Sequence, residues 1–230
     1  MFMMKNILAI DTSSQKCSVA VSTNNQLFQQ SSELERQSAQ RILPMVAELL
    51  VDAKFSLPQL DLIAVIAGPG SFTGLRIGIG VAQGLSAANS TPVIALSSLA
   101  VTAMAANRMS SFSQFFVSEV AREREIYFAA YRISKRLGVE LCGHEQVSVP
   151  ELLQPPHEAI KGEPWCAVGK GWANRVEIQS RLNCPIENTI IEPEVNMSDI
   201  CKLAELRFAA GDAVSAELLR PNYVKDKLDY

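Results

Sequence analysis

The feature that most constrains the fold is a glycine-rich stretch set between an apolar run and a long helical pattern. Residues 62–67 are all apolar, and Gly68-Pro69-Gly70-Ser71-Phe72-Thr73-Gly74 follows them directly. A continuous apolar run of this length, bounded by glycine and proline, is typical of a strand buried in a parallel sheet. Gly68 and Gly70 allow backbone conformations closed to other residues, and Ser71 or Thr73 can cap the following helix. The stretch therefore predicts a strand, a tight turn and a helix.

The first half of the chain repeats this alternation. Hydrophobic periodicity predicts strands at residues 7–10, 17–23, 26–32, 62–67 and 92–96, and helices at residues 38–53, 72–88 and 98–107. Tight polar turns join the first three strands into an antiparallel meander, and the later alternation requires right-handed parallel crossovers. This succession predicts an α/β fold, the ribonuclease-H-like half-domain of the actin, sugar-kinase and Hsp70 superfamily.

A weaker copy of the succession follows. We expect strands at residues 114–118, 126–131, 139–142 and 165–168, and helices at residues 151–153 and 198–210. Ser198 is the expected N-cap of the last helix and Gly211 its C-cap. The prediction is thus a two-lobed fold with a degenerate second lobe. Residues 1–107 form the first lobe, residues 108–213 the second, and residues 214–230 pack back on the first.

Composition narrows the classes of function. The net charge of −3 gives no overall attraction to a phosphate backbone, so we expect any contact with nucleic acid to be indirect. The five scattered cysteines contain no C-x-x-C pair, which is typical of reduced thiols in the cytoplasm. No apolar stretch approaches the length of about 20 residues that spans a bilayer, and no signal peptide is evident. We expect a cytoplasmic protein without a membrane partner.

Two stretches of the first lobe could approach a phosphate. Asp11, Thr12 and Ser13 follow the first strand, where an acid could hold a metal ion while hydroxyls approach phosphate. Alternatively, these side chains only cap a tight turn. The Gly68, Gly70, Ser71 and Thr73 stretch opens a helix, whose N-terminus is a natural anion site, or it forms a turn without a ligand. It is not a Walker loop, because no Gly-Lys-Ser/Thr follows.

A third stretch lies in the second lobe. Gly169 and Gly171 flank Lys170 after the strand at residues 165–168. They could form an adenine or phosphate turn. The alternative is an ordinary reverse turn with Trp172 packed beneath it.

The helix after the first loop contains four glycines. Gly74, Gly78, Gly80 and Gly84 each cost about 1 kcal/mol relative to alanine inside a helix. Their spacing of four within each pair allows another backbone to approach closely. The approaching element is either the protein's own sheet or a partner helix.

No catalytic or metal-binding set emerges from the sequence. His144 and His157 are the two histidines, far apart, whereas a catalytic zinc needs about three protein ligands. No nucleophile and base pair is apparent. We therefore predict no catalytic residue and no metal site.

Several motifs of the chain resemble those of the TsaB family, also called YeaZ. The resemblance rests on residues 7–13, 40–46 and 68–78, with a weaker echo at residues 221–224. It implies a non-catalytic paralogue of TsaD, the metalloenzyme that transfers a threonylcarbamoyl group to an adenosine beside the tRNA anticodon. It also implies a TsaD-like transferase and a TsaE-like ATPase as partners, and a homodimer in their absence. No cofactor of its own is implied; ATP or ADP would sit at a shared interface.

The chain also differs from related proteins at two places. TsaD-like proteins carry a His-x-x-x-His metal motif after the glycine helix and its following strand, where this chain has Ser98 and Thr102. Hydroxyls cannot replace two imidazoles on iron or zinc. Related proteins often have an aspartate where Val120 stands, so nucleotide binding by this chain alone should be weak. The expectation is an accessory subunit, not an enzyme.

Two hypotheses about function follow. In the first, the first two helices form a helical interface with TsaD or with a second copy. Its candidate contacts are Arg41, Ile42, Met45, Leu49, Leu75, Gly78, Ile79 and Gln83. In the second, Asp11 and the two glycine loops serve an ATP-dependent phosphotransferase or ATPase of the sugar-kinase superfamily.

Overall fold

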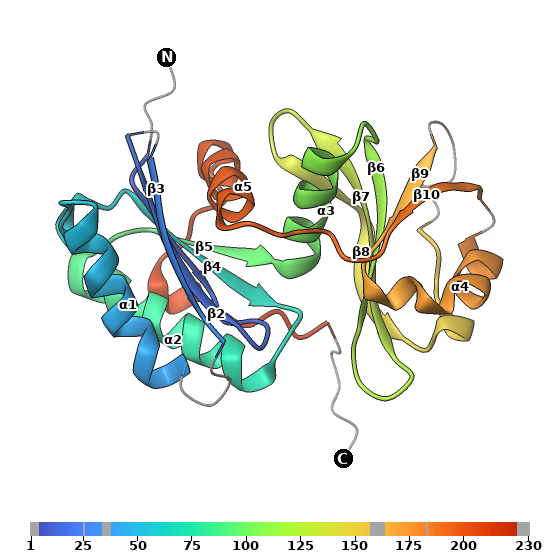
Figure 1. The fold of residues 1–230 in the computed structure, drawn as a ribbon, viewed down its shortest axis with the longest axis horizontal. Coiled ribbons are helices and arrows are strands. Elements are labelled where there is room, and N and C mark those ends of the chain that lie inside the picture. The colour runs from blue at the N-terminus through green and yellow to red at the C-terminus, as the bar shows by residue number, and fades with distance from the viewer. Residues whose placement is uncertain (1–4, 25, 34–37, 157–163, 183, 225–230) are drawn as a thin grey trace. The chain divides into compact units, whose positions relative to one another are not determined.

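The structure is a computed structural model that describes residues 5–24, 26–33, 38–156, 164–182 and 184–224. These residues form two compact α/β units (Figure 1). The first unit takes the described residues of Met1–Ser98 and Asn196–Asn222, and the second takes those of Leu99–Val195 and Tyr223–Tyr230. The chain therefore leaves the first unit, builds the second and then returns to the first.

The first unit contains a mixed five-stranded sheet with the order β3-β2-β1-β4-β5. Its strands are β1 (Ile7–Asp11), β2 (Cys17–Thr23), β3 (Gln26–Ser32), β4 (Leu62–Gly68) and β5 (Val93–Ser97). The first three are antiparallel, whereas β4 and β5 run parallel to β1. This is the predicted meander followed by parallel crossovers.

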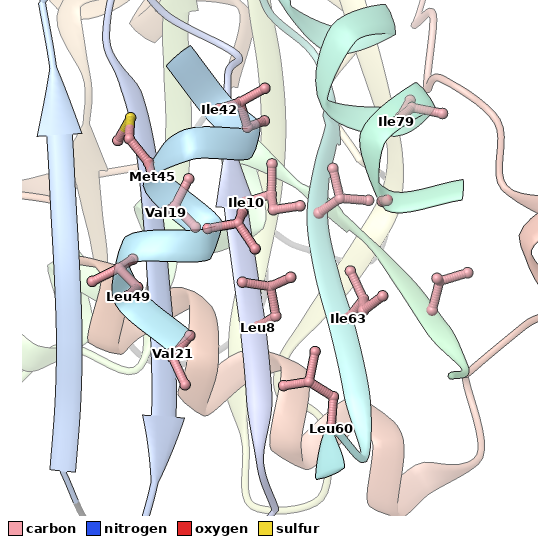
Figure 2. Close-up of a cluster of buried hydrophobic side chains, with 14 of the residues drawn as sticks. Leu8, Ile10, Val19, Val21, Ile42, Met45, Leu49, Leu60, Ile63 and Ile79 are labelled. Carbon is pink, nitrogen blue, oxygen red and sulfur yellow. The ribbon is translucent and has the colours of Figure 1, made fainter. Parts of the chain in front are cut away.

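Helices cover both faces of the first sheet (Figure 1). The helices α1 (Ser38–Asp52) and α2 (Phe72–Asn89) lie on one face, and α5 (Met197–Ala210) lies on the other. Two short 3-10 turns, η1 (Leu57–Gln59) and η4 (Ala216–Leu218), flank α2. The α1 and α2 side chains fill one aliphatic core with β1, β2 and β4 (Figure 2). Each such buried aliphatic side chain contributes about 1.5–3 kcal/mol relative to an exposed one.

The second unit repeats the strand order of the first, as β8-β7-β6-β9-β10. Its elements are α3 (Ser98–Met109), β6 (Gln114–Val120), β7 (Ile126–Ser134), β8 (Gly138–Ser148), η2 (Pro150–Leu152), β9 (Trp165–Val168), η3 (Lys170–Asn174), α4 (Arg175–Leu182) and β10 (Ile186–Ile190). Again three antiparallel strands are followed by two parallel ones. The repeated topology confirms the predicted fold class.

The boundaries between the units differ from the predicted ones. Residues 196–213 were expected in the second lobe, but α5 packs on β1, β2, β4 and β5 of the first unit. Conversely, α3 belongs to the second unit from Leu99 onward. The N-cap of α5 is Asn196 and not Ser198, because the Asp199 carboxylate accepts a hydrogen bond of 3.0 Å from the Asn196 N–H.

The returning segment packs on the first unit as far as Asn222. Val214 forms a β-bridge with Val93, and the Asn222 N–H donates to the Ala67 carbonyl over 2.7 Å. Residues 225–230 of the predicted packing segment lie outside the described residues. Across the part of the chain that the structure describes, no helix is both long and apolar enough to cross a bilayer.

Candidate functional site

The polar turn after β1 is held by the Asp11 carboxylate. Its Oδ1 atom accepts hydrogen bonds from the Ser13 N–H (2.8 Å) and from the Ser13 hydroxyl (2.7 Å). Burial raises the pKa of Asp11, and the two hydrogen bonds from Ser13 partly oppose that rise. The geometry is that of a side chain capping its own turn.

The β1 turn and the β4–α2 loop meet in the structure, as their positions after parallel strands suggest. The Ser71 N–H donates to the Ser13 carbonyl over 2.7 Å. The Thr12 hydroxyl donates to the Gly74 carbonyl, also over 2.7 Å. Two sequence-predicted stretches therefore form one continuous hydrogen-bonded site at the carboxyl ends of β1 and β4.

Three glycines make this close approach possible. A Cβ atom on Gly70 would lie 2.5 Å from the Ser13 carbonyl oxygen, and one on Gly74 would lie 1.9 Å from the Thr12 carbonyl oxygen. On Gly78 it would lie 2.4 Å from the Thr12 hydroxyl. The close approach expected along α2 is thus made, over its first two turns, by the protein's own β1 turn.

Some backbone N–H groups at the start of α2 already donate hydrogen bonds to acceptors within the protein. Besides the Ser71 N–H, the Gly74 N–H donates to the Ser71 hydroxyl over 3.2 Å, which makes Ser71 the N-cap. Ser71 and Thr73 remain exposed at the rim, where the positive end of the helix dipole also lies. An anion at this loop would find the rim hydroxyls but would compete with the β1 turn for backbone donors.

The returning segment, which was predicted to pack on the first lobe, also contacts this site. At Gly68, where φ is +133°, an added Cβ atom would lie 2.5 Å from the Asn222 carbonyl oxygen. Gln83, predicted as a partner contact, instead donates from its side-chain amide to the Ala216 and Leu219 carbonyls over 3.1 and 3.2 Å. The packing of residues 214–230 on the first lobe was predicted, but their contacts with Gly68 and Gln83 were not.

The second glycine loop is built in the same manner within the second unit. A Cβ atom on Gly169 would lie 2.3 Å from the Ser118 carbonyl oxygen, and one on Gly171 would lie 2.1 Å from the Ser118 hydroxyl. Burial raises the pKa of the neighbouring Glu119, and contacts with Lys170 partly oppose the rise. The Trp172 indole N–H donates to a buried backbone carbonyl, that of Phe116, over 2.9 Å.

The positions aligned with the metal motif serve local packing. The Ser98 hydroxyl donates to the Pro69 carbonyl over 2.6 Å, and Thr102 is buried. His144 is exposed on β8, and His157 lies outside the described residues. Among the residues that the structure does describe, no three His, Cys, Asp or Glu side chains gather in a way that could hold a metal ion.

The structure corrects the residues predicted for a partner interface. Most of them are buried in the first unit's own core: Ile42, Met45, Leu49, Leu75, Gly78 and Ile79. Figure 2 shows the side chains of Ile42, Met45 and Leu49 pointing from α1 toward the sheet. The helical period was read correctly, but it marks the face turned inward. Arg41 remains exposed.

The outward faces of the same helices carry a different set of apolar groups. On α1, Leu43 is 51% and Val51 75% exposed, and on α2 Phe72 is 47% exposed. Gly80 and Gly84 are also exposed, and a Cβ atom on either would meet nothing within 4 Å. We call these five residues the α1–α2 face. The Arg76 guanidinium stacks on the Phe72 ring at 3.3 Å from its centroid, at one end of this face.

Two units of one strand order, each with a strand end packed against a glycine loop, define a protein of the actin, sugar-kinase and Hsp70 fold class. Comparison with known proteins gives the family. Residues 26–226 match the family model described as TsaD, tRNA N6-adenosine threonylcarbamoyltransferase. The chain belongs to the TsaB family within this group, as the following relatives show.

The relatives match over nearly their whole length. The tRNA threonylcarbamoyladenosine biosynthesis protein TsaB of Escherichia coli is 33% identical over 96% of this chain and 95% of its own. The protein of the same name from Haemophilus influenzae is 30% identical over 97% and 95%. The structure of YeaZ from Pseudomonas aeruginosa, at 35% identity, superposes with a TM-score of 0.82 over 96% of this chain and 100% of that one.

Proposed function

We propose that this protein is a non-catalytic subunit in the formation of threonylcarbamoyladenosine next to the tRNA anticodon. Its partner would be a TsaD-type threonylcarbamoyltransferase. The names of the relatives from Escherichia coli and Haemophilus influenzae support the pathway. The observation that carries the partner role is the exposed apolar α1–α2 face.

The α1–α2 face has the composition of a surface that another protein covers. Leu43, Val51 and Phe72 expose large apolar side chains on neighbouring helices, and aromatic residues are enriched at interface cores. Gly80 and Gly84 face open space although each costs about 1 kcal/mol in a helix interior. A second helix packed across them would account for that cost, because the absent side chains let its backbone come close.

The polar loops favour the same proposal over a phosphotransferase. Asp11 is occupied in capping its turn, and the Thr12 and Ser13 groups hold the Gly68–Gly74 loop. Ser98 and Thr102 offer hydroxyls where the paralogue is expected to offer imidazoles. ATP or ADP would then bind only where a partner completes the site, with Ser71 and Thr73 at its rim.

One face cannot hold two partners at once. We therefore propose that a TsaD-like protein and a second copy of this chain compete for the α1–α2 face, so that the homodimer forms in the partner's absence. A TsaE-like ATPase would join at another surface, and tRNA would be contacted through the partner. The proposed compartment is the cytoplasm.

The test is to place a bulky charge on the face without touching the core. Gly84→Arg and Leu43→Arg should each weaken the complex with a TsaD-like protein about 30-fold or more, the scale of an interface hot spot. Val176→Arg is the matched control, because Val176 is 79% exposed on α4 of the second unit. Size-exclusion chromatography and calorimetry measure binding, and thermal unfolding confirms that each variant is folded.

Two results would overturn the proposal. Full binding by both face variants would show that the partner sits elsewhere. Tight magnesium-ATP binding with turnover by the isolated chain would make it an enzyme. A modification assay tests the pathway directly. It contains tRNA, a TsaD-like protein and this chain, and either protein is left out in turn. Leaving out this chain should abolish the formation of threonylcarbamoyladenosine.

A further inference from the structure

A cavity in the first unit lies outside the site described above. It has a volume of about 240 Å³ and opens at the amino-terminal end of β1, opposite the Asp11 turn. One wall is formed by residues at the end of β2 and the start of β3, and the other by α5. Neither the glycine loop nor the α1–α2 face contributes to its lining.

The strand side of the cavity is fixed by Asn6. Its backbone N–H donates to the Asp61 carboxylate over 2.9 Å, and its side-chain amide donates to the Gln59 carbonyl over 3.1 Å. Its side-chain oxygen accepts a hydrogen bond of 2.7 Å from Thr23. The backbone beside Lys5 and at the end of β2 is thereby held in place before any ligand arrives.

Two lysine residues line the cavity, one from each wall. Lys5 contributes from the strand side, with its Nζ atom 5.2 Å above the ring of Phe208. Lys202 contributes from α5 and pairs with Glu205 over 3.0 Å. Side chains in this pair are 57% and 25% exposed, and ion pairs of such exposure are weak. The Lys202 ammonium can therefore turn from Glu205 to a bound anion at little cost, and the Lys5 ammonium can do so by leaving the Phe208 ring.

The rest of the lining suits an anion attached to a small polar body. Ser22 and Ser198 supply hydroxyls, and Asn24 and Gln26 supply amides. Cys201 is 6% exposed, and burial raises the pKa of its thiol to about 12, so this thiol adds no negative charge to the α5 wall at neutral pH. Glu205 supplies an acceptor for a ligand hydroxyl.

We propose that this cavity binds a small phosphorylated molecule. Two lysines are a common means of holding phosphate as point charges, and the surrounding hydroxyls and amides supply more donors than a carboxylate needs. The volume equals that of about eight water molecules at roughly 30 Å³ each. That space accommodates a phosphate group with a short organic part. The inference does not depend on the proposed partner role.

The probes are inorganic phosphate, glycerol 3-phosphate and glycerol, titrated into the ¹⁵N-labelled full chain and followed by NMR. Phosphate and glycerol 3-phosphate should give saturable shifts at the cavity residues, with glycerol 3-phosphate binding more tightly, and glycerol should give none. Lys5→Gln and Lys202→Gln should each weaken binding about tenfold, and the double variant should abolish it. Lys135→Gln, in the exposed β7–β8 turn, removes the same charge elsewhere and should leave binding unchanged.

The absence of saturable shifts at the cavity with either phosphate probe would overturn the proposal. So would equal losses in the Lys135→Gln control, because binding would then follow net charge. Binding that both cavity variants retain would place the anion elsewhere. Citrate serves as a carboxylate comparison, and tighter binding of citrate than of glycerol 3-phosphate would contradict the choice of phosphate.

Discussion

The two units share one strand order but differ in what covers their sheets. In the first unit, the helices α1 and α2 have 15 and 18 residues. In the second, the described residues between β8 and β9 form the three-residue turn η2, and those between β9 and β10 form η3 and the eight-residue helix α4. A short helix can cover a core but offers little outward surface. The long helices of the first unit therefore have two roles: their inner sides pack on the sheet, and their outer sides form the α1–α2 face.

The cores differ in the same sense. The first is aliphatic, with side chains such as Leu8, Ile10 and Val19 beneath its long helices. The second uses rings, with Phe116 stacked on Trp165 at 4.1 Å between centroids and Trp172 buried beside them. Large aromatic side chains bury much area each, so they can complete a core where little helix is available.

The largest effect is expected from a substitution in the Gly68–Gly74 loop of the first unit. Gly74→Ala should destabilise the protein by about 3 kcal/mol, because the new methyl group meets the fixed Thr12 carbonyl. Gly84→Ala, in the same helix but facing open space, should instead stabilise it by about 1 kcal/mol. Urea unfolding measures both. Equal effects from the two substitutions would show that helix propensity alone governs these glycines.

A substitution in the second glycine loop, at residues 169–171, shows whether an added side chain is tolerated there as poorly as at Gly74. Gly171→Ala should destabilise by about 1–2 kcal/mol. The loss is smaller than at Gly74 because the nearest obstacle is the Ser118 hydroxyl, which can rotate away, and the nearest backbone atom, the Ser118 carbonyl carbon, lies at 2.9 Å instead of 1.9 Å. Amide hydrogen exchange should show the loosening mainly in β6 and β9. A loss as large as that of Gly74→Ala would mean that the Ser118 backbone is the real obstacle.

The smallest effects concern the buried acids beside the two loops. Burial raises the pKa of both Asp11 and Glu119 above their ordinary values of 3.8 and 4.5. The folded state then holds the proton more tightly than the unfolded state. The resulting stability is complete below the ordinary pKa and is lost as pH rises through the raised one. Asp11→Asn and Glu119→Gln should therefore each stabilise the protein at neutral pH.

That gain should shrink toward acid and vanish below about pH 4. Thermal unfolding across pH 3 to 8 measures it, and each amide keeps an oxygen that can accept the hydrogen bonds of the acid it replaces. A gain that stays constant with pH in both variants would contradict the assigned pKa direction.

Sequence reasoning served best where patterns were local. The strands at residues 17–23 and 26–32 have their predicted bounds, and the glycine loop opens α2 at the predicted residue. The elements α4 and β10 went unpredicted because both are polar, with Glu187 and Asn188 exposed on β10. Periodicity cannot mark a strand that lies at a sheet edge with few apolar side chains.

The candidate site was harder to predict because it depends on whether each helix face points to the core or to solvent. A helical period shows that Ile42, Met45 and Leu49 share one face, but a core and an interface both need such a face. The carbonyls of Thr12 and Ser13 carry no side-chain signature at all, although they decide which glycines are required. The Gln83 contacts join residues more than 130 positions apart, beyond the reach of any local pattern.

The return of the chain to its first unit has a consequence for synthesis. The edge of β5 acquires its bridge only when Val214 emerges, and the hydrogen bond from Asn222 to the Ala67 carbonyl forms later still. At about 5–20 residues per second, the ribosome needs on the order of 6–25 s to travel from Ser98 to Asn222. During that interval the first unit has one sheet edge unpaired while the second unit is being made. The first unit, although it is begun first, is therefore still incomplete when the last strand of the second sheet, β10, has been made.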